Sequence, residues 1–378
     1  MHITEIRKNF PITEHAIYLD NGSRCPLCKP VLDRQQSFQL FCSESGRDYA
    51  SWWRLADDLR GKIARLIHAQ AKQVGYASST TAALNLLAQG YEWKPGDNVI
   101  IAASEFPSNV YPWLGLRERN VEIRFLQPQN GWITLSQFQE LADKNTRIIS
   151  VSHIQAANGF KMDLEELGAF CEKKGIVFCV DATQSMGAYP IDVVSSHIDF
   201  LATSTYKWLM GSDGLAVFYC SDALQSSLRQ VFWGWSGRID RNEFNQYPLS
   251  YPQEAKRFEL GNPNFSSLVA LDAAMDFRDS VTNETIMKKT CEIVSCFKET
   301  LQGIKGLQIL GNFDSRHQGA LLTLAIENAP MTYHELNKQG FLCALRRDGI
   351  RISPYFYNTQ EEAEAFAKAM RFLLKGGN

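Results

Sequence analysis

The stretch "FLATSTYKWLMGSDGLAVFYC", residues 200–220, joins two apolar runs through a polar, glycine-containing turn. The first run is typical of a buried strand, and it ends in small hydroxyl residues just before Lys207. A lysine usually marks solvent, but Lys207 lies in an aromatic setting between two predicted strands. Burial there would lower the pKa of the amine and make it usable as a nucleophile. The alternative is a lysine that extends its ammonium group into solvent at the strand edge.

Strand-like runs alternate with helix-like runs from about residue 75 to 220. This alternation is typical of an α/β domain with a mainly parallel sheet. A helix is predicted over 163–174, where Asp163 can cap the first turn and apolar residues recur at helical spacing. The predicted strands are "NVIIAAS" (98–104), "VEIRFLQ" (121–127), "TRIISVSH" (146–153), "GIVFCVDA" (175–182) and "IDFLATS" (198–204).

The pattern after residue 260 is that of an α+β domain. A helix is predicted to begin within 262–277, and residues 349–374 have the pattern of a strand, a turn and a last helix. Thr359 and Glu362 have the spacing of a capping box at the start of that helix. The length and this change in pattern predict two domains, residues 1–260 and 261–378.

Composition and charge exclude several classes of protein. The chain has 378 residues, 45% of them hydrophobic, and a formal net charge of -2 without a long run of one sign. Nothing in this balance indicates a nucleic-acid partner. No apolar stretch reaches the roughly 18 residues that span a bilayer. The first 20 residues lack the apolar core of a secretory signal, so no secretory signal is predicted. The charge balance and the lack of a long apolar stretch predict no membrane partner.

Nine cysteines are scattered along the chain, which favours reduced thiols in a cytoplasmic protein. Cys25 and Cys28 form one C-x-x-C pair. No second pair follows at zinc-like spacing, so no metal site is predicted. A redox role would need a helix start that lowers the pKa of one thiol, and coincidence is the favoured interpretation of the pair.

Polar residues gather where the predicted strands end. Asp181 ends a buried strand and Gln184 follows it; a buried carboxylate is unfavourable unless it is paired, although it can also act as an N-cap. In "YASSTTAALNLLAQG" (76–90) four hydroxyl residues precede a helix, which suits a phosphate as well as an ordinary N-cap. A phosphate cradle, a buried carboxylate and the amine of Lys207 are together what pyridoxal phosphate requires.

The arrangement resembles fold-type I pyridoxal-phosphate enzymes of the class V aminotransferase group. This group includes cysteine desulfurases, kynureninases and isopenicillin N epimerase-like proteins. The resemblance is carried by "VDATQSMGAYPIDV" (180–193), "STYKWLMGSDG" (204–214) and "RISPYFYNT" (351–359). It implies an N-terminal arm and a large cofactor-binding domain with a mainly parallel, seven-stranded sheet, followed by a small α+β domain. It also implies a homodimer with its active sites at the interface.

The resemblance implies a role for each matching residue. Lys207 matches the Schiff-base lysine, which is also the general acid and base. Asp181 would pair with the pyridine nitrogen, Gln184 would hydrogen-bond the ring hydroxyl, and Phe106 would stack on the ring. Arg351 matches the arginine that holds the substrate carboxylate as a bidentate fork, although an arginine between Ile350 and Ile352 on a strand is otherwise typical of a solvated face. Further cofactor contacts are expected from Thr80, Thr81 and Ser204 at the phosphate, from Tyr206 beside the lysine, and from Trp235 in "GWSG" and Asn262 in "GNPN".

The chain departs from the desulfurases at several positions. Desulfurases have histidine where this chain has Phe106 and Tyr206, and Ala156 stands where they have an asparagine near the substrate. They also carry a nucleophilic cysteine on a mobile loop before the arginine. The nearest cysteine here, Cys343, lies in a strand-like run too close to Arg351 for a long loop, so core packing is predicted for it. These departures disfavour persulfide chemistry.

The resemblance therefore predicts an enzyme that acts on an amino acid through Lys207, with aminotransferase as the first choice. The alternative is a kynureninase-like or cysteine-lyase-like enzyme that cleaves C–C or C–S bonds, or an epimerase. A different class is a non-catalytic binding protein with the same fold, which would not need Lys207, Asp181 and Arg351. A nucleotide-binding α/β protein ranks last because the chain lacks both glycine-rich phosphate motifs.

Overall fold

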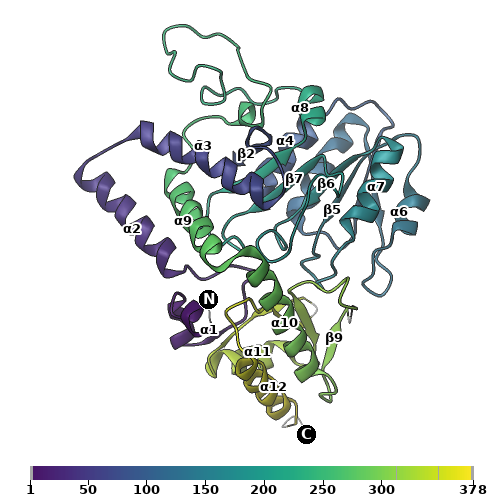
Figure 1. Ribbon diagram of the computed structural model, residues 1–378. Coiled ribbons are helices and arrows are strands. Elements are labelled where there is room, and N and C mark those ends of the chain that lie inside the picture. Colours follow the sequence, from purple (N-terminus) through teal and green to yellow (C-terminus); the bar gives the residue numbers. More distant parts are fainter. Residues whose placement is uncertain (1–2, 312, 348, 376–378) are drawn as a thin grey trace.

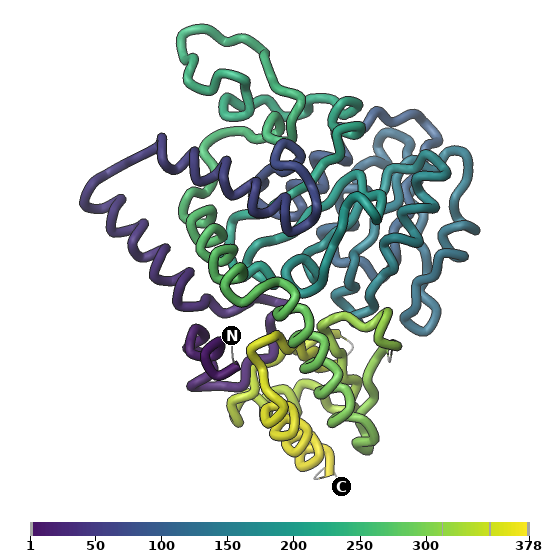
Figure 2. Tube along the Cα trace, in the orientation of Figure 1, coloured from purple at the N-terminus to yellow at the C-terminus, as the bar shows by residue number. Residues whose placement is uncertain are grey.

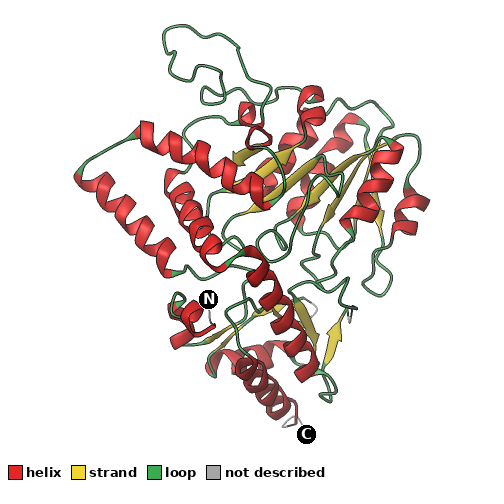
Figure 3. Ribbon diagram, viewed as in Figure 1, coloured by secondary structure: helices red, strands yellow, loops and turns green. Residues whose placement is uncertain are grey.

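The structure is a computed structural model that describes residues 3–311, 313–347 and 349–375 (Figure 1). A large sheet with its helices forms one part of the molecule, and a smaller sheet with its own helices forms the other (Figure 3). The α-helices are α1 (Ile3–Arg7), α2 (Lys29–Glu44), α3 (Tyr49–Leu66), α4 (Thr80–Gly90), α5 (Tyr111–Leu114), α6 (Leu135–Leu141), α7 (Leu164–Lys174), α8 (Asp222–Ser227), α9 (Phe265–Val281), α10 (Asn283–Leu301), α11 (Ala329–Lys338) and α12 (Gln360–Lys375). Short 3-10 helices are η1 (Pro11–Glu14), η2 (Ala71–Gln73), η3 (Pro107–Asn109), η4 (Gly115–Arg119) and η5 (Ala255–Phe258).

The large sheet has seven strands in the order β2-β8-β7-β6-β5-β3-β4. Neighbouring strands from β7 to β4 are parallel, whereas β8 is antiparallel to both β7 and β2. The predicted fold class and the five predicted strands are confirmed, each strand within two residues of its expected ends. The strands are β2 (Val74–Ala77), β3 (Asn98–Ala102), β4 (Glu122–Leu126), β5 (Thr146–Ser152), β6 (Val177–Asp181), β7 (Phe200–Ser204) and β8 (Ala216–Cys220).

Helices cover both faces of this sheet because its central strands are apolar on both sides. In β3, Val99 and Ile101 pack in the cluster that contains α4 and α5, while Ile100 and Ala102 pack in the cluster with α3 and α7. Fully buried parallel strands have this continuous apolar pattern. The helix predicted over 163–174 is α7, and the Asp163 carboxylate accepts a hydrogen bond from a first-turn amide, which confirms its capping role.

The smaller part contains an antiparallel sheet in the order β12-β13-β10-β9, formed by β9 (Gln308–Leu310), β10 (Leu322–Ala325), β12 (Ala344–Arg346) and β13 (Gly349–Ile352). The capping box at α12 is confirmed: the Glu362 amide donates to Thr359 Oγ1 at 3.4 Å, and the Thr359 amide donates to Glu362 Oε2 at 3.1 Å. The helix predicted within 262–277 is α9, capped by Asn264.

The N-terminal segment packs against the C-terminal part of the chain, as the purple and yellow ends of the trace in Figure 2 show. Strand β1 (Ile17–Tyr18) pairs in parallel with β11 (Phe341–Leu342). In the opposite direction, α9 packs against α2 and α3 and contributes to the core of the large sheet. Contacts therefore cross residue 260 in both directions, and the boundary placed there stays a prediction.

Two further findings concern classes of site. Over residues 3–311, 313–347 and 349–375, no helix combines the length and apolar character that a membrane span requires. Within the same residues, no group of three or more histidine, cysteine or acidic side chains is arranged to hold a metal ion. Cys25 and Cys28 are both buried as free thiols.

Candidate active site

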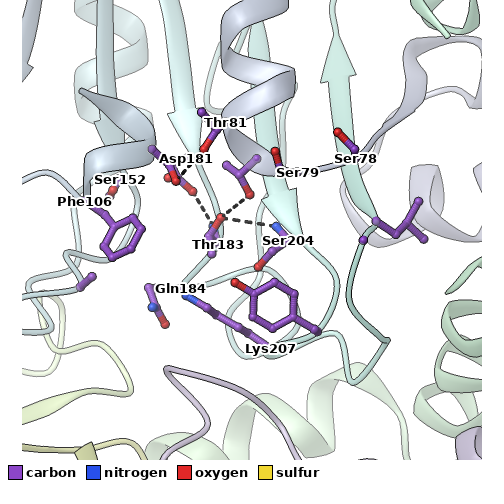
Figure 4. Close-up of a pocket in the computed structure, with 16 residues that line it drawn as sticks. Ser78, Ser79, Thr81, Phe106, Ser152, Asp181, Thr183, Gln184, Ser204 and Lys207 are labelled. Atoms are coloured by element: carbon purple, nitrogen blue, oxygen red, sulfur yellow. Dashed lines mark hydrogen bonds between the residues drawn. The ribbon is translucent and has the colours of Figure 1, made fainter. Parts of the chain in front are cut away.

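The carboxyl ends of the parallel strands meet at one edge of the large sheet and form a pocket there (Figure 4). Ser152 ends β5, Asp181 ends β6 and Ser204 ends β7, and the first two face each other in the sheet register. Ligands in open α/β sheets bind at this edge. The pocket is lined by Ser78, Ser79, Thr80, Thr81, Phe106, Ser108, Ser152, Ala156, Asp181, Thr183, Gln184, Ser204, Tyr206, Lys207, Gly214 and Leu215.

Hydroxyl groups and a helix start form one wall of the pocket. Ser79 caps α4 with its own side chain, as an ordinary N-cap does. Thr80 and Thr81 follow in the first turn, and Thr80 Oγ1 lies 3.1 Å from Thr183 Oγ1. The Ser204 hydroxyl is buried without a hydrogen-bond partner in the described structure. An unpartnered hydroxyl beside the free amides of a helix N-terminus fits a bound phosphate.

Lys207 lies on the turn after β7 with its side chain only 7% exposed. Its Nζ atom is 5.7 Å from the ring centroid of Phe106 and 5.8 Å from that of Tyr206, and it makes no hydrogen bond or ion pair within the described residues. Burial lowers the pKa of this amine to about 8, and the positive charge of Arg351 acts in the same direction. The Asp181 carboxylate partly opposes that shift. The structure therefore holds a buried, nucleophilic amine at the pocket.

Asp181 is 3% exposed, and burial raises the pKa of its carboxyl group. Its Oδ1 atom accepts a hydrogen bond from the Thr183 amide at 2.9 Å. A buried carboxylate is stabilised by a cationic partner, so this one fits the protonated ring nitrogen of a cofactor. Gln184 is held in place at both ends: its Nε2 donates to the Gly22 carbonyl at 2.8 Å, and its Oε1 accepts from Trp208 at 2.9 Å. One N–H of that amide is left for a ligand.

Arg351 approaches the pocket from β13 of the smaller sheet and does not line it. The side chain is buried, so it is not part of a solvated face, although it does alternate with isoleucines on a strand as predicted. Its Nη2 donates to Ser23 Oγ at 2.7 Å and lies 3.5 Å from Asp20 Oδ1, and its Nη1 donates to the Ala156 carbonyl at 3.4 Å. Burial, with the nearby charge of Arg346, lowers the pKa of Arg351 to about 10. Its buried Nε has no partner in the described structure, so this guanidinium group has donors to offer an anion.

Trp235 and Asn262 lie outside this pocket. Trp235 is partly exposed and packs edge-on against Trp53, with ring centroids 6.1 Å apart. Asn262 lines a neighbouring cavity that shares Ser78 and Leu215 with the pocket. The structure of one chain thus does not bring these two residues to the other predicted ligands, and their roles at the cofactor stay predictions.

Several residues in or next to the pocket were not predicted from the sequence, among them Ser108, Thr183 and the neighbouring Glu105. Thr183 connects the segment at Thr80 with the end of β7. Its hydroxyl lies within hydrogen-bonding distance of Thr80 Oγ1 and accepts a hydrogen bond from the Ser204 amide at 3.4 Å. Its position in the sequence, two residues after the end of β6, could have identified it as a residue of the pocket. Glu105, directly before Phe106, is a buried carboxylate that accepts from the Ser152 amide and from Gln155 Nε2, both at 2.7 Å, and from the Ser152 hydroxyl. Burial raises its pKa to about 7.

The buried amine, the carboxylate and the hydroxyl wall at a helix start fit one cofactor, and the arginine beside them fits the carboxylate of an amino-acid substrate. Pyridoxal phosphate supplies an aldehyde for the lysine and a ring that takes up electrons from the substrate. The fold and this site define a pyridoxal-phosphate-dependent enzyme of fold type I. The chain belongs to the aminotransferase class-V family, whose sequence profile matches residues 17–366.

Several known proteins are similar to this chain over nearly its whole length. The "Probable cysteine desulfurase" of Methanothermobacter thermautotrophicus is 27% identical, with 98% of each chain covered. The apo structure of the cysteine desulfurase from Thermococcus onnurineus NA1 is 25% identical and superimposes with a TM-score of 0.90, covering 100% of this chain and 99% of the other. The cystine C–S lyase C-DES, at 18% identity and a TM-score of 0.88 over 96% of this chain and 99% of that one, shares the fold.

Proposed function

We propose that this enzyme cleaves the C–S bond of cysteine or an S-substituted cysteine by β-elimination, and that the sulfur leaves as a free thiol. One observation carries the choice of elimination: among the described residues that line the pocket there is no cysteine to accept the sulfur. The names of several similar proteins, which are cysteine desulfurases, support sulfur amino acids as the substrate class. C–S cleavage was the alternative in the sequence analysis, and these relatives favour it over the aminotransferase placed first.

The position of Cys343 supports release of the sulfur. Cys343 lies between β11 and β12 in the apolar core, 5% exposed. Burial raises the pKa of its thiol to about 12, so at pH 7 it is a neutral thiol and a weak nucleophile. Strands β12 and β13 form a short hairpin in which Arg346 pairs with Gly349. The hairpin leaves no room for a long cysteine-bearing loop before Arg351.

The residues of the site can be assigned to the steps of an elimination. Lys207 has a pKa near 8, so part of it is neutral at pH 7 and able to take the proton from the substrate Cα. Asp181 would keep the ring nitrogen protonated, and Arg351 would hold the α-carboxylate. With R for the group on sulfur, the overall reaction converts the S-substituted cysteine and one water into R–SH, pyruvate and ammonium. No oxidant, reductant or second substrate is needed.

A desulfurase is the second candidate, because several relatives that match nearly the full chain carry that name. A desulfurase would yield alanine and leave the sulfur as a persulfide. An aminotransferase would require an added 2-oxo acid to accept the amino group. The homodimer and the cytoplasmic location stay predictions.

A product panel separates the three reactions. The cofactor-loaded enzyme is incubated with L-cysteine and with S-ethyl-L-cysteine, and pyruvate, ammonia, thiol and alanine are measured with and without a 2-oxo acid. We expect equal amounts of pyruvate, ammonia and thiol, independent of the 2-oxo acid. Alanine as the main product, or turnover only with the 2-oxo acid, would overturn the proposal. Lys207→Ala serves as the control for reactions that occur without the enzyme.

A further inference from the structure

Two arginines meet at one hydroxyl group beside the pocket. Arg346 donates from Nη2 to Ser23 Oγ at 2.5 Å, and Arg351 donates from its own Nη2 to the same oxygen at 2.7 Å. The two Nη2 atoms can therefore lie no farther apart than the sum of those distances. Two positive charges at such a separation repel each other, and an anion between or beside them would offset that repulsion.

The positive charge at this point is only partly neutralised. Arg346 forms no ion pair within the described residues, and its other hydrogen bond goes to the carbonyl of Leu345 at 3.0 Å. The nearby carboxylate is that of Asp20, 3.5 Å from the Nη2 atom of Arg351. Arg346 also lies close enough to lower the pKa of Lys207 and of Arg351. Within the described residues Arg346 thus has no carboxylate partner of its own, whereas Arg351 has Asp20 beside it.

The two arginines lie at different depths. Arg351 is buried on β13, whereas Arg346 is exposed at the end of β12, on the other strand of the hairpin. The chain at Gly22 packs tightly against the inner arginine: an added Cβ there would lie 3.3 Å from Arg351 Nη2 and would clash with Leu321 Cδ2 at 2.5 Å. A ligand held by Arg351 at one end would therefore meet Arg346 farther out, toward solvent.

We propose that Arg346 and Ser23 form a subsite for a second acidic group on the substrate, beyond its sulfur atom. The substrate class is then S-substituted cysteines whose substituent carries a carboxylate or another anion. This inference rests on the proposed C–S cleavage. A simple surface arginine would point into water, whereas this one shares its hydroxyl partner with the buried arginine assigned to the α-carboxylate.

Two ligands of the same shape test the subsite. S-carboxymethyl-L-cysteine carries a second carboxylate, and S-carboxamidomethyl-L-cysteine carries a neutral amide in its place. Binding to the cofactor-loaded enzyme is measured by calorimetry, and turnover by pyruvate release. We expect the acid to bind about tenfold more tightly than the amide, since Arg346 is partly solvated, and we expect high salt to reduce the preference. Arg346→Gln should abolish the preference for the acid over the amide. Arg347→Gln, at the exposed neighbouring arginine, should preserve the preference.

Each result has one consequence. Equal binding of acid and amide by the unaltered enzyme would overturn the subsite. An Arg346→Gln variant that loses affinity for both ligands alike would also overturn it, because Arg346 would then hold the α-carboxylate. Preferential binding of the acid without pyruvate release would support the subsite and contradict the proposed elimination. Pyruvate release from both ligands without an effect of Arg346 would contradict the subsite alone.

Discussion

The pKa of Lys207 gives the most quantitative test of the site. The structure lowers it from the ordinary 10.5 to about 8, with burial as the main cause. At pH 7 about one-tenth of an amine with a pKa of 8 is neutral, compared with about one part in three thousand for a solvated lysine. At pH 7 the neutral, reactive form of Lys207 should therefore be roughly 300 times more abundant than that of a lysine with the ordinary pKa.

Competitive acetylation of the cofactor-free protein measures this directly. Trace acetic anhydride is added at intervals between pH 6 and pH 11, and mass spectrometry quantifies the modified Lys207 peptide against the exposed Lys305. We expect the labelling of Lys207 to reach half of its maximum near pH 8. A midpoint above pH 10 would refute the claim that burial prepares this amine as a nucleophile.

Two variants test two nearby charges that shift the pKa of Lys207 in opposite directions. The carboxylate of Asp181 raises the pKa of Lys207, so Asp181→Asn should move the labelling midpoint to lower pH. The guanidinium group of Arg351 lowers it, so Arg351→Gln should move the midpoint to higher pH. If both variants moved the midpoint in the same direction, or neither moved it, these charges would not act on Lys207 as the structure shows.

Three further predictions concern single substitutions. Arg351→Lys should weaken amino-acid binding by about 1.5–3 kcal/mol, because an ammonium group cannot form the bidentate fork; unchanged affinity in calorimetry would contradict this. Glu105→Gln should gain stability relative to the unaltered protein as pH rises. The folded pKa of Glu105, about 7, lies above the unfolded value of 4.5, so the charged carboxyl group destabilises the fold increasingly as pH rises between these values, by on the order of 3 kcal/mol. Urea unfolding at pH 5 and pH 8 measures the difference in unfolding free energy between the variant and the unaltered protein. The same difference at both pH values would refute the prediction. Glu259→Gln should destabilise the protein by about 3–5 kcal/mol, since it removes the carboxylate that Arg60 contacts at 2.7 and 2.9 Å in a buried pair; an unchanged unfolding midpoint would show that the pair contributes little.

The local sequence pattern was sufficient to predict most strands of the large sheet and most of the polar residues at the pocket. Continuous apolar runs predicted the parallel strands. The polar residues at the ends of these strands, such as Asp181 and Ser204, lie together because parallel strands end at one edge of the sheet. The cap of α7 by Asp163 and the capping box at α12 were predictable for the same reason: each depends on residues three apart.

Contacts between distant segments could not be predicted in this way. Ser23 meets Arg351 from the other end of the chain, and Gly22 fixes the amide of Gln184. No periodicity or motif predicts these contacts between distant segments, because they depend on the pairing of β1 with β11. Glu105 was missed because a glutamate in a short polar segment is usually solvated, and only the packed structure shows that it is buried.

The motifs around Lys207 identify the cofactor more specifically than they identify the reaction. All enzymes of this kind need the amine, the carboxylate and the phosphate contacts, so these residues leave transamination and elimination equally open. The choice depends on groups farther out, such as the buried Cys343 and the exposed Arg346, whose positions follow from tertiary packing.

The fate of the sulfur atom tests the central claim most directly. The cofactor-loaded enzyme is allowed to turn over L-cysteine without a reductant, and its cysteine peptides are then weighed by mass spectrometry while sulfide, pyruvate and alanine are measured in solution. We predict sulfide and pyruvate in equal amounts and no added sulfur on any of the nine cysteines. Alanine in solution together with a cysteine peptide one sulfur atom heavier would contradict elimination and identify a desulfurase.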